Sequence, residues 1–276
     1  EDIQNHKDYR NIDIDQVGVK GIRYPITVLD KDMGEQQTVA EINMYVNLPR
    51  YYKGAHMSRF VEILNEHSRR ISLQNFSGIL EEVKEKLNAE SAHMEITFPY
   101  FISKPAPVTG IEGLMEYRCT FKGSLGNKSD LVIMIHVPIS TLCPCSKEIS
   151  DYGAHNQRGK VRLQVRFKKF VWIEDLIRLV EQSASSDVFS VLKREDEKYV
   201  TEKAYNNPMF VEDIVRDIAV NLNNDPNITW FSVECENFES IHNHNAYAYI
   251  EKHKDDDLIK SPLSPPLAAS GPASSP

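Results

Sequence analysis

Apolar side chains alternate with polar ones, or recur at helical spacing, along most of the chain, and these patterns divide its first half into six elements. Alternation with a period of two is typical of a strand with one buried face, and a spacing of three to four is typical of an amphipathic helix. The first half therefore predicts the order ββααββ. Its elements are strands at 24–29 and 39–46, helices at 60–64 and 76–87, and strands at 94–100 and 114–121.

The second half repeats this order. The clearest strand is 161–167, where apolar residues at odd positions alternate with polar residues at even positions. We expect an α+β fold of two tandem ββααββ units, with antiparallel sheets backed by helices, and divergent duplication is the simplest origin. The elements of the second half are strands at 131–137 and 161–167, helices at 172–182 and 209–222, and strands at 228–235 and 246–250.

These patterns define three segments. The first unit covers 13–125, and the second covers 126–252 and carries most of the candidate site residues described below. The last segment, 253–276, ends in a stretch rich in Pro, Ser and Ala, which is typical of a disordered tail. We therefore exclude it from the predicted fold.

Composition narrows the class of protein. The chain has 276 residues, with 32 Lys and Arg against 40 Asp and Glu, and a net charge of −8. This acidic excess argues against binding to duplex nucleic acid, so an anionic ligand would need a local basic pocket. No apolar run approaches the ~20 residues that span a bilayer, and residues 1–10 do not resemble a signal peptide. We expect a cytoplasmic protein with neither a nucleic-acid nor a membrane partner.

The four cysteines are too few for a disulfide framework, and two of them draw attention. Cys143 and Cys145 flank a proline in a long polar connection, 140–159, which we expect to be extended with both thiols on one side. One of these sulfurs and His155 are suitable ligands for an ion such as zinc. The alternative is that both cysteines are small apolar fillers and that His155 is a surface residue. A redox pair is less favoured, because Cys-x-Cys closes a strained ring.

A second polar cluster lies between the last two predicted strands. Glu239, His242 and His244 offer acid and base groups, because histidine titrates near neutrality and burial tunes a carboxylate. A His-x-His pair in an exposed turn is, however, more often only solvated. By itself this cluster remains weak evidence for catalysis.

Two further carboxylates have ordinary structural explanations. Glu197 lies in the charged stretch 193–203, and such stretches are normally solvated surface. Glu212 lies near the start of a predicted helix, just after Pro208, where the helix dipole favours a carboxylate. The residue pattern alone selects neither of them as a site residue.

Five segments in this order resemble the prokaryotic type IB GTP cyclohydrolase family, over about residues 13–252. Their joint occurrence is far more specific than any single one of them. The segments are VGVKGIRYP at 17–25, GAHMSRF at 54–60, STLCPCSK at 140–147, YGAHNQR at 152–158 and ESIHNH at 239–244.

The resemblance implies a tunnelling fold, in which ββααββ units assemble into a toroidal oligomer around a central tunnel. It also implies a homotetramer with active sites at the subunit interfaces. The implied reaction converts GTP and water into formate and 7,8-dihydroneopterin triphosphate, the first step of tetrahydrofolate biosynthesis.

The resemblance further implies a metal site at Cys143, His155 and Glu197, with water completing the shell. Three protein ligands and an open position are what a catalytic metal needs. Water bound there would be acidified and could attack C8 of the guanine ring. The donor set suits zinc, manganese or iron(II). Cys143 and Cys145 could exchange the roles of ligand and non-ligand.

The remaining family positions fall on the polar clusters. Glu212 corresponds to the carboxylate that binds the guanine edge, and Cys145 would contact the substrate beside C8. Glu239, His242 and His244 would be catalytic, with the histidine pair transferring protons. Candidate ligands of the triphosphate within the family segments are Lys20, Arg23, Arg59 and Arg158.

Two alternatives stay open at this point. One is a different tunnelling-fold enzyme acting on a purine or pterin, for which a cysteine nucleophile would be the sign. The other is a non-catalytic zinc-binding or redox-sensing oligomer. A structural metal site of that kind would have four protein ligands and no open position.

Overall fold

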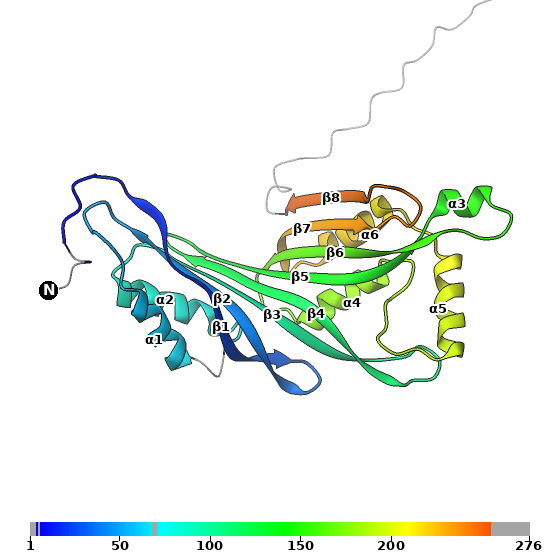
Figure 1. Cartoon of the computed structure of the whole chain (residues 1–276), viewed down its shortest axis with the longest axis horizontal. Helices are drawn as coiled ribbons and strands as arrows, with labels where there is room; N and C mark the ends of the chain where they lie inside the picture. Colours follow the sequence, from blue (N-terminus) through cyan, green and yellow to red (C-terminus); the bar gives the residue numbers. More distant parts are fainter. Residues whose placement is uncertain (1–3, 5, 68–70, 255–276) are drawn as a thin grey trace, which may run out of the picture.

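The structure is a computed structural model that describes residue 4 and residues 6–67 and 71–254 (Figure 1). Eight strands form one antiparallel sheet in which the spatial order, β1 to β8, is the order along the chain. Residues 255–276, nearly all of the tail predicted at 253–276, lie outside the described residues. Within the described part, no helix has the length and apolar character needed to cross a membrane.

The first half has the predicted order ββααββ. Its strands are longer than the pattern indicated, because their ends are exposed on both faces and the apolar alternation stops there. The elements are β1 (Ile14–Asp30), β2 (Gly34–Leu48), α1 (Met57–His67), α2 (Phe76–Leu87), β3 (Ala92–Pro105) and β4 (Glu112–Leu125).

The second half repeats the order and adds two helices, α3 and α5, that the pattern did not predict. Strands β4 and β5 pair with each other, so the two halves share one continuous sheet. The elements are β5 (Ser129–Leu142), α3 (Pro144–Ile149), β6 (Asn156–Phe167), α4 (Ile173–Gln182), α5 (Arg194–Asn206), α6 (Val211–Asn224), β7 (Ile228–Asn237) and β8 (Ala246–His253).

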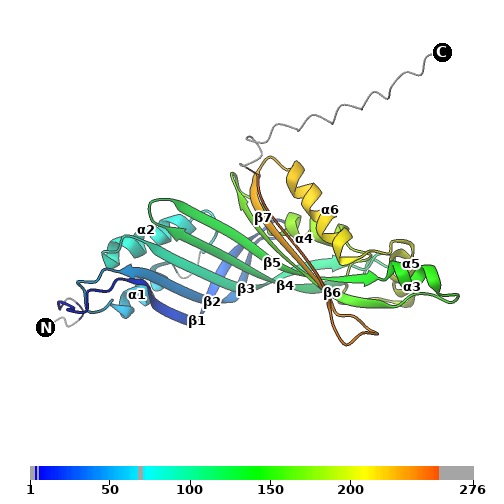
Figure 2. The same cartoon turned by 90° about the horizontal axis from the view of Figure 1, so that it is seen from above.

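Helices of both halves pack on the same face of the sheet. A Cβ atom at Gly123 of β4 would lie 2.5 Å from the ring of Phe76, so α2 packs directly against this strand. Tyr117, six residues earlier on the same face of β4, meets Glu181 of α4. One buried apolar cluster therefore runs beneath both halves. Figure 2 shows α1 and α2 at one end of the sheet and α3 and α5 at the other.

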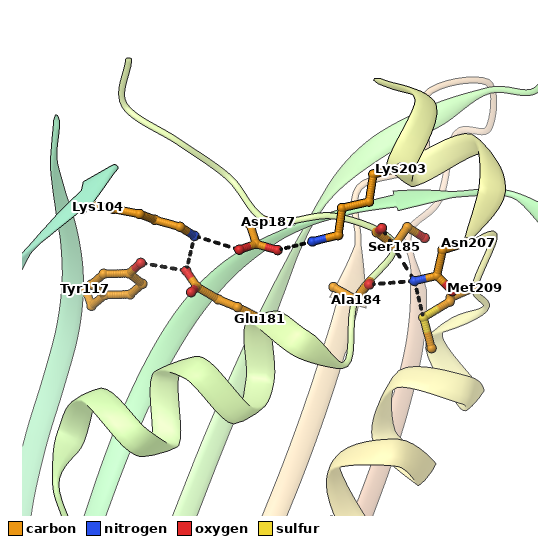
Figure 3. Close-up of polar contacts among 9 residues, drawn as sticks. All are labelled: Lys104, Tyr117, Glu181, Ala184, Ser185, Asp187, Lys203, Asn207 and Met209. Carbon is orange, nitrogen blue, oxygen red and sulfur yellow. Dashed lines mark hydrogen bonds and ion pairs between the residues drawn. The ribbon is translucent and has the colours of Figure 1, made fainter. Parts of the chain in front are cut away.

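Two carboxylates of α4 bind the second half to the first. Glu174 Oε1 accepts hydrogen bonds from the Tyr100 hydroxyl at 2.5 Å and from the Lys31 backbone N–H at 2.7 Å. Two helical turns later, Glu181 Oε1 accepts from the Tyr117 hydroxyl at 2.6 Å and from Lys104 Nζ at 2.8 Å (Figure 3). Burial, together with the neighbouring carboxylate, raises the pKa of each tyrosine. Both hydroxyls therefore remain donors at neutral pH.

We expect Glu181→Ala to lower the free energy of unfolding by about 2 kcal/mol, because it leaves the Tyr117 hydroxyl and one side of Lys104 without an acceptor. Glu202→Ala is the matched control, since Glu202 pairs with Lys198 where both side chains are well exposed. Its loss should cost less than about 0.5 kcal/mol. Urea denaturation of both variants measures the difference, and equal effects would mean that the buried contact does not hold the halves together.

Candidate active site

The connection between β5 and β6 differs from the prediction. It is not a long extended loop: β5 continues to Leu142, β6 begins at Asn156, and α3 lies between them. Cys143 is the N-cap of α3, and its Sγ accepts a hydrogen bond from the Ser146 N–H at 3.4 Å. Pro144 at the first helical position favours this helix start, because no N–H is needed there. Cys145 follows within the first turn and is exposed.

His155 is held beside Cys143 in a defined orientation. The Cys143 backbone N–H donates to the His155 carbonyl at 3.1 Å. His155 Nδ1 lies 3.0 Å from Gln157 Oε1, while Gln157 Nε2 donates to Thr141 Oγ1 at 3.0 Å. Because the amide nitrogen is used on Thr141, Gln157 Oε1 accepts the proton of His155 Nδ1. The lone pair of the imidazole is therefore on Nε2, the atom free to bind a ligand.

The loop between β7 and β8 completes the polar cluster. Glu239 Oε2 lies 4.0 Å from His155 Nδ1, and both side chains are largely buried. The His242 ring is 6.4 Å from the His155 ring, and His244 stacks on His242 at 5.1 Å with an interplanar angle of 11°. The structure thus brings together four of the predicted site residues beside Cys143. This loop lies at the same end of the molecule as α3 and α5 (Figures 1 and 2).

The charged stretch 193–203 was expected to be solvated surface. In the structure it forms most of α5. Its Asp196 is fully buried and accepts hydrogen bonds from Thr109, Val108 and Lys193. Burial alone would raise the pKa of Asp196, but these bonds hold it below its usual range. The helix escaped prediction because only Asp196 and Ala204 are buried in it, so it has no apolar stripe.

Glu197 lies at the other end of α5 from the cluster. Lys147 of α3 donates to the Tyr205 carbonyl at 2.5 Å and lies 4.3 Å from the centre of its ring. Tyr205 follows Glu197 by eight residues, which is about 12 Å along a helix. Within the described residues, no three His, Cys, Asp or Glu side chains are grouped to hold a metal ion. One chain therefore places Cys143 and His155 together and leaves Glu197 apart.

Glu212 occupies the first turn of α6, as predicted, and is exposed. Burial raises the pKa of the Cys235 thiol of β7 to about 12, and the negative charge of Glu212 contributes to this increase. Burial likewise raises the pKa of Cys119. These two cysteines remain protonated at neutral pH, so Cys143 and Cys145 are the thiols available for chemistry.

Gln157 is a site residue that the sequence analysis did not identify. In β6 the odd positions face the core, and Gln157 is a buried polar residue among Val161, Leu163 and Val165. A polar side chain at a core position needs a hydrogen-bonding partner. The feature of the sequence that could have identified Gln157 is therefore a glutamine at a position where the strand pattern predicts an apolar residue.

Solved structures define the fold class. A uricase from Bacillus fastidious matches with a TM-score of 0.54 at 8% identity, over 96% of this chain and 99% of that one. The urate oxidase of Bacillus subtilis 168 matches with a TM-score of 0.51 at 9% identity, over 87% and 99%. Identity this low shows the fold alone. The chain is a tunnelling-fold protein, as predicted, whereas the toroidal oligomer stays a prediction.

Sequence relatives define the family. The family model of type I GTP cyclohydrolase folE2 matches residues 1–248. The GTP cyclohydrolase FolE2 of Syntrophobacter fumaroxidans is 66% identical over 255 residues, 92% of this chain and 99% of that protein. The GTP cyclohydrolase FolE2 of Syntrophus aciditrophicus is 64% identical over 252 residues, 91% and 99% of the two chains. The chain therefore belongs to the type I GTP cyclohydrolase folE2 family of enzymes, which confirms the resemblance.

We expect Gln157→Leu to release the tautomer of His155, because it removes the acceptor of the Nδ1 proton while keeping the side-chain volume. In metal-free protein the ratio of the Nδ1–H tautomer to the Nε2–H tautomer of the neutral ring should fall about fivefold, since one hydrogen bond is worth about 1 kcal/mol. Long-range ¹H–¹⁵N correlation of labelled histidine measures this. Gln164→Leu, on the same strand and opposite face, should change nothing. An unaltered His155 in Gln157→Leu would show that another group orients the ring.

Proposed function

We propose that this chain is a metal-dependent GTP cyclohydrolase, which converts GTP and water into formate and 7,8-dihydroneopterin triphosphate at the start of tetrahydrofolate biosynthesis. The observation that carries the proposal is the cluster of His155, Glu239, His242 and His244 beside Cys143. Its support from outside the chain is family membership, since the relatives are named GTP cyclohydrolase FolE2.

The metal would be held by Cys143, His155 and Glu197. A thiolate, an imidazole and a carboxylate suit zinc, manganese or iron(II), and three ligands leave a position open for water. Two features of the chain fit this assignment: Cys143 and His155 are hydrogen-bonded neighbours, and His155 Nε2 carries a free lone pair. The third ligand requires a second chain. In the proposed homotetramer, with active sites at subunit interfaces, α5 of a neighbouring subunit supplies Glu197.

The chain's own residues have the following roles in the proposed reaction. A divalent ion held by Cys143, His155 and Glu197 would supply an acidified water molecule as the nucleophile at neutral pH. Glu212 accepts two N–H bonds from the guanine edge, which fixes C8 near Cys145. His242 and His244 transfer protons to the ring nitrogen as C8 is attacked, and the carboxylate of Glu239, 4.0 Å from His155 Nδ1, adds negative charge beside the histidines. Ring opening and loss of formate follow.

The triphosphate needs cationic ligands, and backbone contacts of Arg59 and Arg158 bear on the choice between these two of the four candidates. Arg59 already donates to the Lys86 carbonyl at 2.7 Å, which gives it a structural role. The Arg158 carbonyl accepts from the Phe238 N–H at 2.9 Å, so Arg158 borders the loop that carries Glu239. Arg158 is exposed, and a guanidinium binds phosphate in a bidentate manner, so we favour it over Arg59.

We expect chelator-treated protein to release no formate from GTP, and manganese, zinc or iron(II), added separately, to restore formate and pterin absorbance. Cys143→Ala and His155→Ala should each lose metal affinity by at least about 100-fold and stay folded, because the core does not depend on this connection. Metal analysis and circular dichroism measure the two properties.

Two variants sharpen this experiment. Cys145→Ser should retain metal if Cys143 is the ligand, and His253→Ala, at an exposed position of β8, should behave as wild type. A folded tetramer that turns over GTP with none of the three metals would contradict the proposed function. Full metal binding by Cys143→Ala would contradict the ligand assignment alone.

We expect Glu212→Ala to keep its metal and to bind GTP at least about tenfold more weakly, because it removes an acceptor of two N–H bonds. Asp217→Ala is the control, an exposed carboxylate farther along α6. Calorimetric titration with GTP compares the two variants. Unchanged GTP affinity in Glu212→Ala would remove this residue from the site.

A further inference from the structure

The N-terminal turn of α5 is attached to the first half of the chain through a single carboxylate. Asp196 accepts from the Lys193, Val108 and Thr109 backbone N–H groups, each at 2.9 Å, and from Thr109 Oγ1 at 2.7 Å. A carboxylate has about four acceptor positions, so this side chain is fully used. With no solvent exposure, it cannot exchange any of these partners for water.

The partner of Asp196 is itself a well-defined turn. Val108 and Thr109 lie in the connection between β3 and β4, where the Ala106 N–H donates to the Ile111 carbonyl at 2.9 Å. The Gly110 N–H donates to the Ala106 carbonyl at 3.0 Å, and Gly110 has a φ of +69°, which glycine adopts without strain. The turn therefore presents two N–H groups and a hydroxyl in fixed positions.

The C-terminal end of α5 is attached independently. Lys203 Nζ lies 2.9 Å from Asp187 Oδ1, and Lys104 Nζ lies 3.2 Å from the other oxygen of the same carboxylate (Figure 3). Asn207, directly after the helix, donates to the Ala184 carbonyl at 3.0 Å. Attachment at both ends prevents α5 from sliding along its axis or turning about it.

The direction of Glu197 follows from this attachment. Successive residues of an α-helix are rotated by about 100°, so a helix that turns Asp196 toward the hairpin turns Glu197 away from it. Glu197 is accordingly exposed, and its carbonyl accepts from Thr201 Oγ1 at 2.7 Å in the next turn. The side chain of Glu197 itself has no partner among the described residues. Its direction is therefore set by the backbone of α5.

We propose that Asp196 is a positioning residue that aims Glu197 for metal binding by fixing α5 against the β3–β4 turn. This rests on the proposed function, in which Glu197 is a metal ligand. The first half of the chain thereby supports a metal site whose three proposed protein ligands all lie in the second half. Supporting groups of this kind typically alter metal affinity by 10- to 100-fold.

The test uses the full-length protein and Co²⁺ or Mn²⁺ alone. In Asp196→Asn, an amide N–H₂ replaces one carboxylate oxygen and faces N–H donors, so the N-terminal turn of α5 loosens while the C-terminal attachment remains. We expect metal affinity to fall 10- to 100-fold, the Co²⁺ absorption spectrum to change, and amides near residue 196 to exchange faster. Glu195→Gln makes the same charge change one residue earlier, at an exposed position, and should have no effect.

A second variant guards against misfolding of the first. Thr109→Ala removes one of the four hydrogen bonds to Asp196 without changing any residue of α5. Metal affinity should fall several-fold. Wild-type affinity in both Asp196→Asn and Thr109→Ala, alongside weakened binding in Glu197→Gln, would overturn the proposal and leave the proposed function intact. Wild-type affinity in Glu197→Gln would overturn the ligand assignment, and the role of Asp196 with it.

Discussion

Three buried carboxylates of the second half, Glu174, Glu181 and Asp196, must each find hydrogen-bond donors in the first half. A buried carboxylate without donors costs several kcal/mol, so these contacts permit only one arrangement of α4 and α5 on the sheet. Apolar packing beneath the helices is less selective, because it tolerates small shifts. The position of α5, and with it the position of Glu197, therefore depends on polar contacts with the first half of the chain.

The order of strands and of the four apolar helices was predictable from the sequence, because each buries one face and the apolar spacing records this. The pattern failed where burial no longer divides an element into two faces. The first residues of β1 are exposed on both faces of the strand. Helix α5 has no apolar stripe and is held by polar contacts at its two ends. The short α3 depends on Cys143 and Pro144 at its start, a local signal that the polar character of the connection concealed.

Among the site residues, those in loops at adjacent strand ends were accessible to sequence reasoning. His155, Glu239, His242 and His244 meet because β6 and β7 are neighbours, so the loop before one strand lies beside the loop after the other. Glu197 and Glu212 were not accessible in this way, since helix surfaces carry many carboxylates and only the family resemblance selected these two. The contact of Gln157 with His155 depends on how the chain folds in three dimensions. The sequence shows only that Gln157 is a polar residue at a position of β6 where apolar residues are expected.

The agreement between strand order and chain order has a consequence for how the molecule folds. Each strand pairs only with the strands before and after it, so the sheet can grow by adding one neighbour at a time, without threading a strand between others. Strand pairing closes its longest loops where helices lie between neighbouring strands, from β2 to β3 and from β6 to β7, whereas the contact of Lys31 with Glu174 joins residues 143 positions apart. Because the entropy cost of closing a loop grows with this separation, we expect the contacts of α4 with the first half to form after the pairs of neighbouring strands.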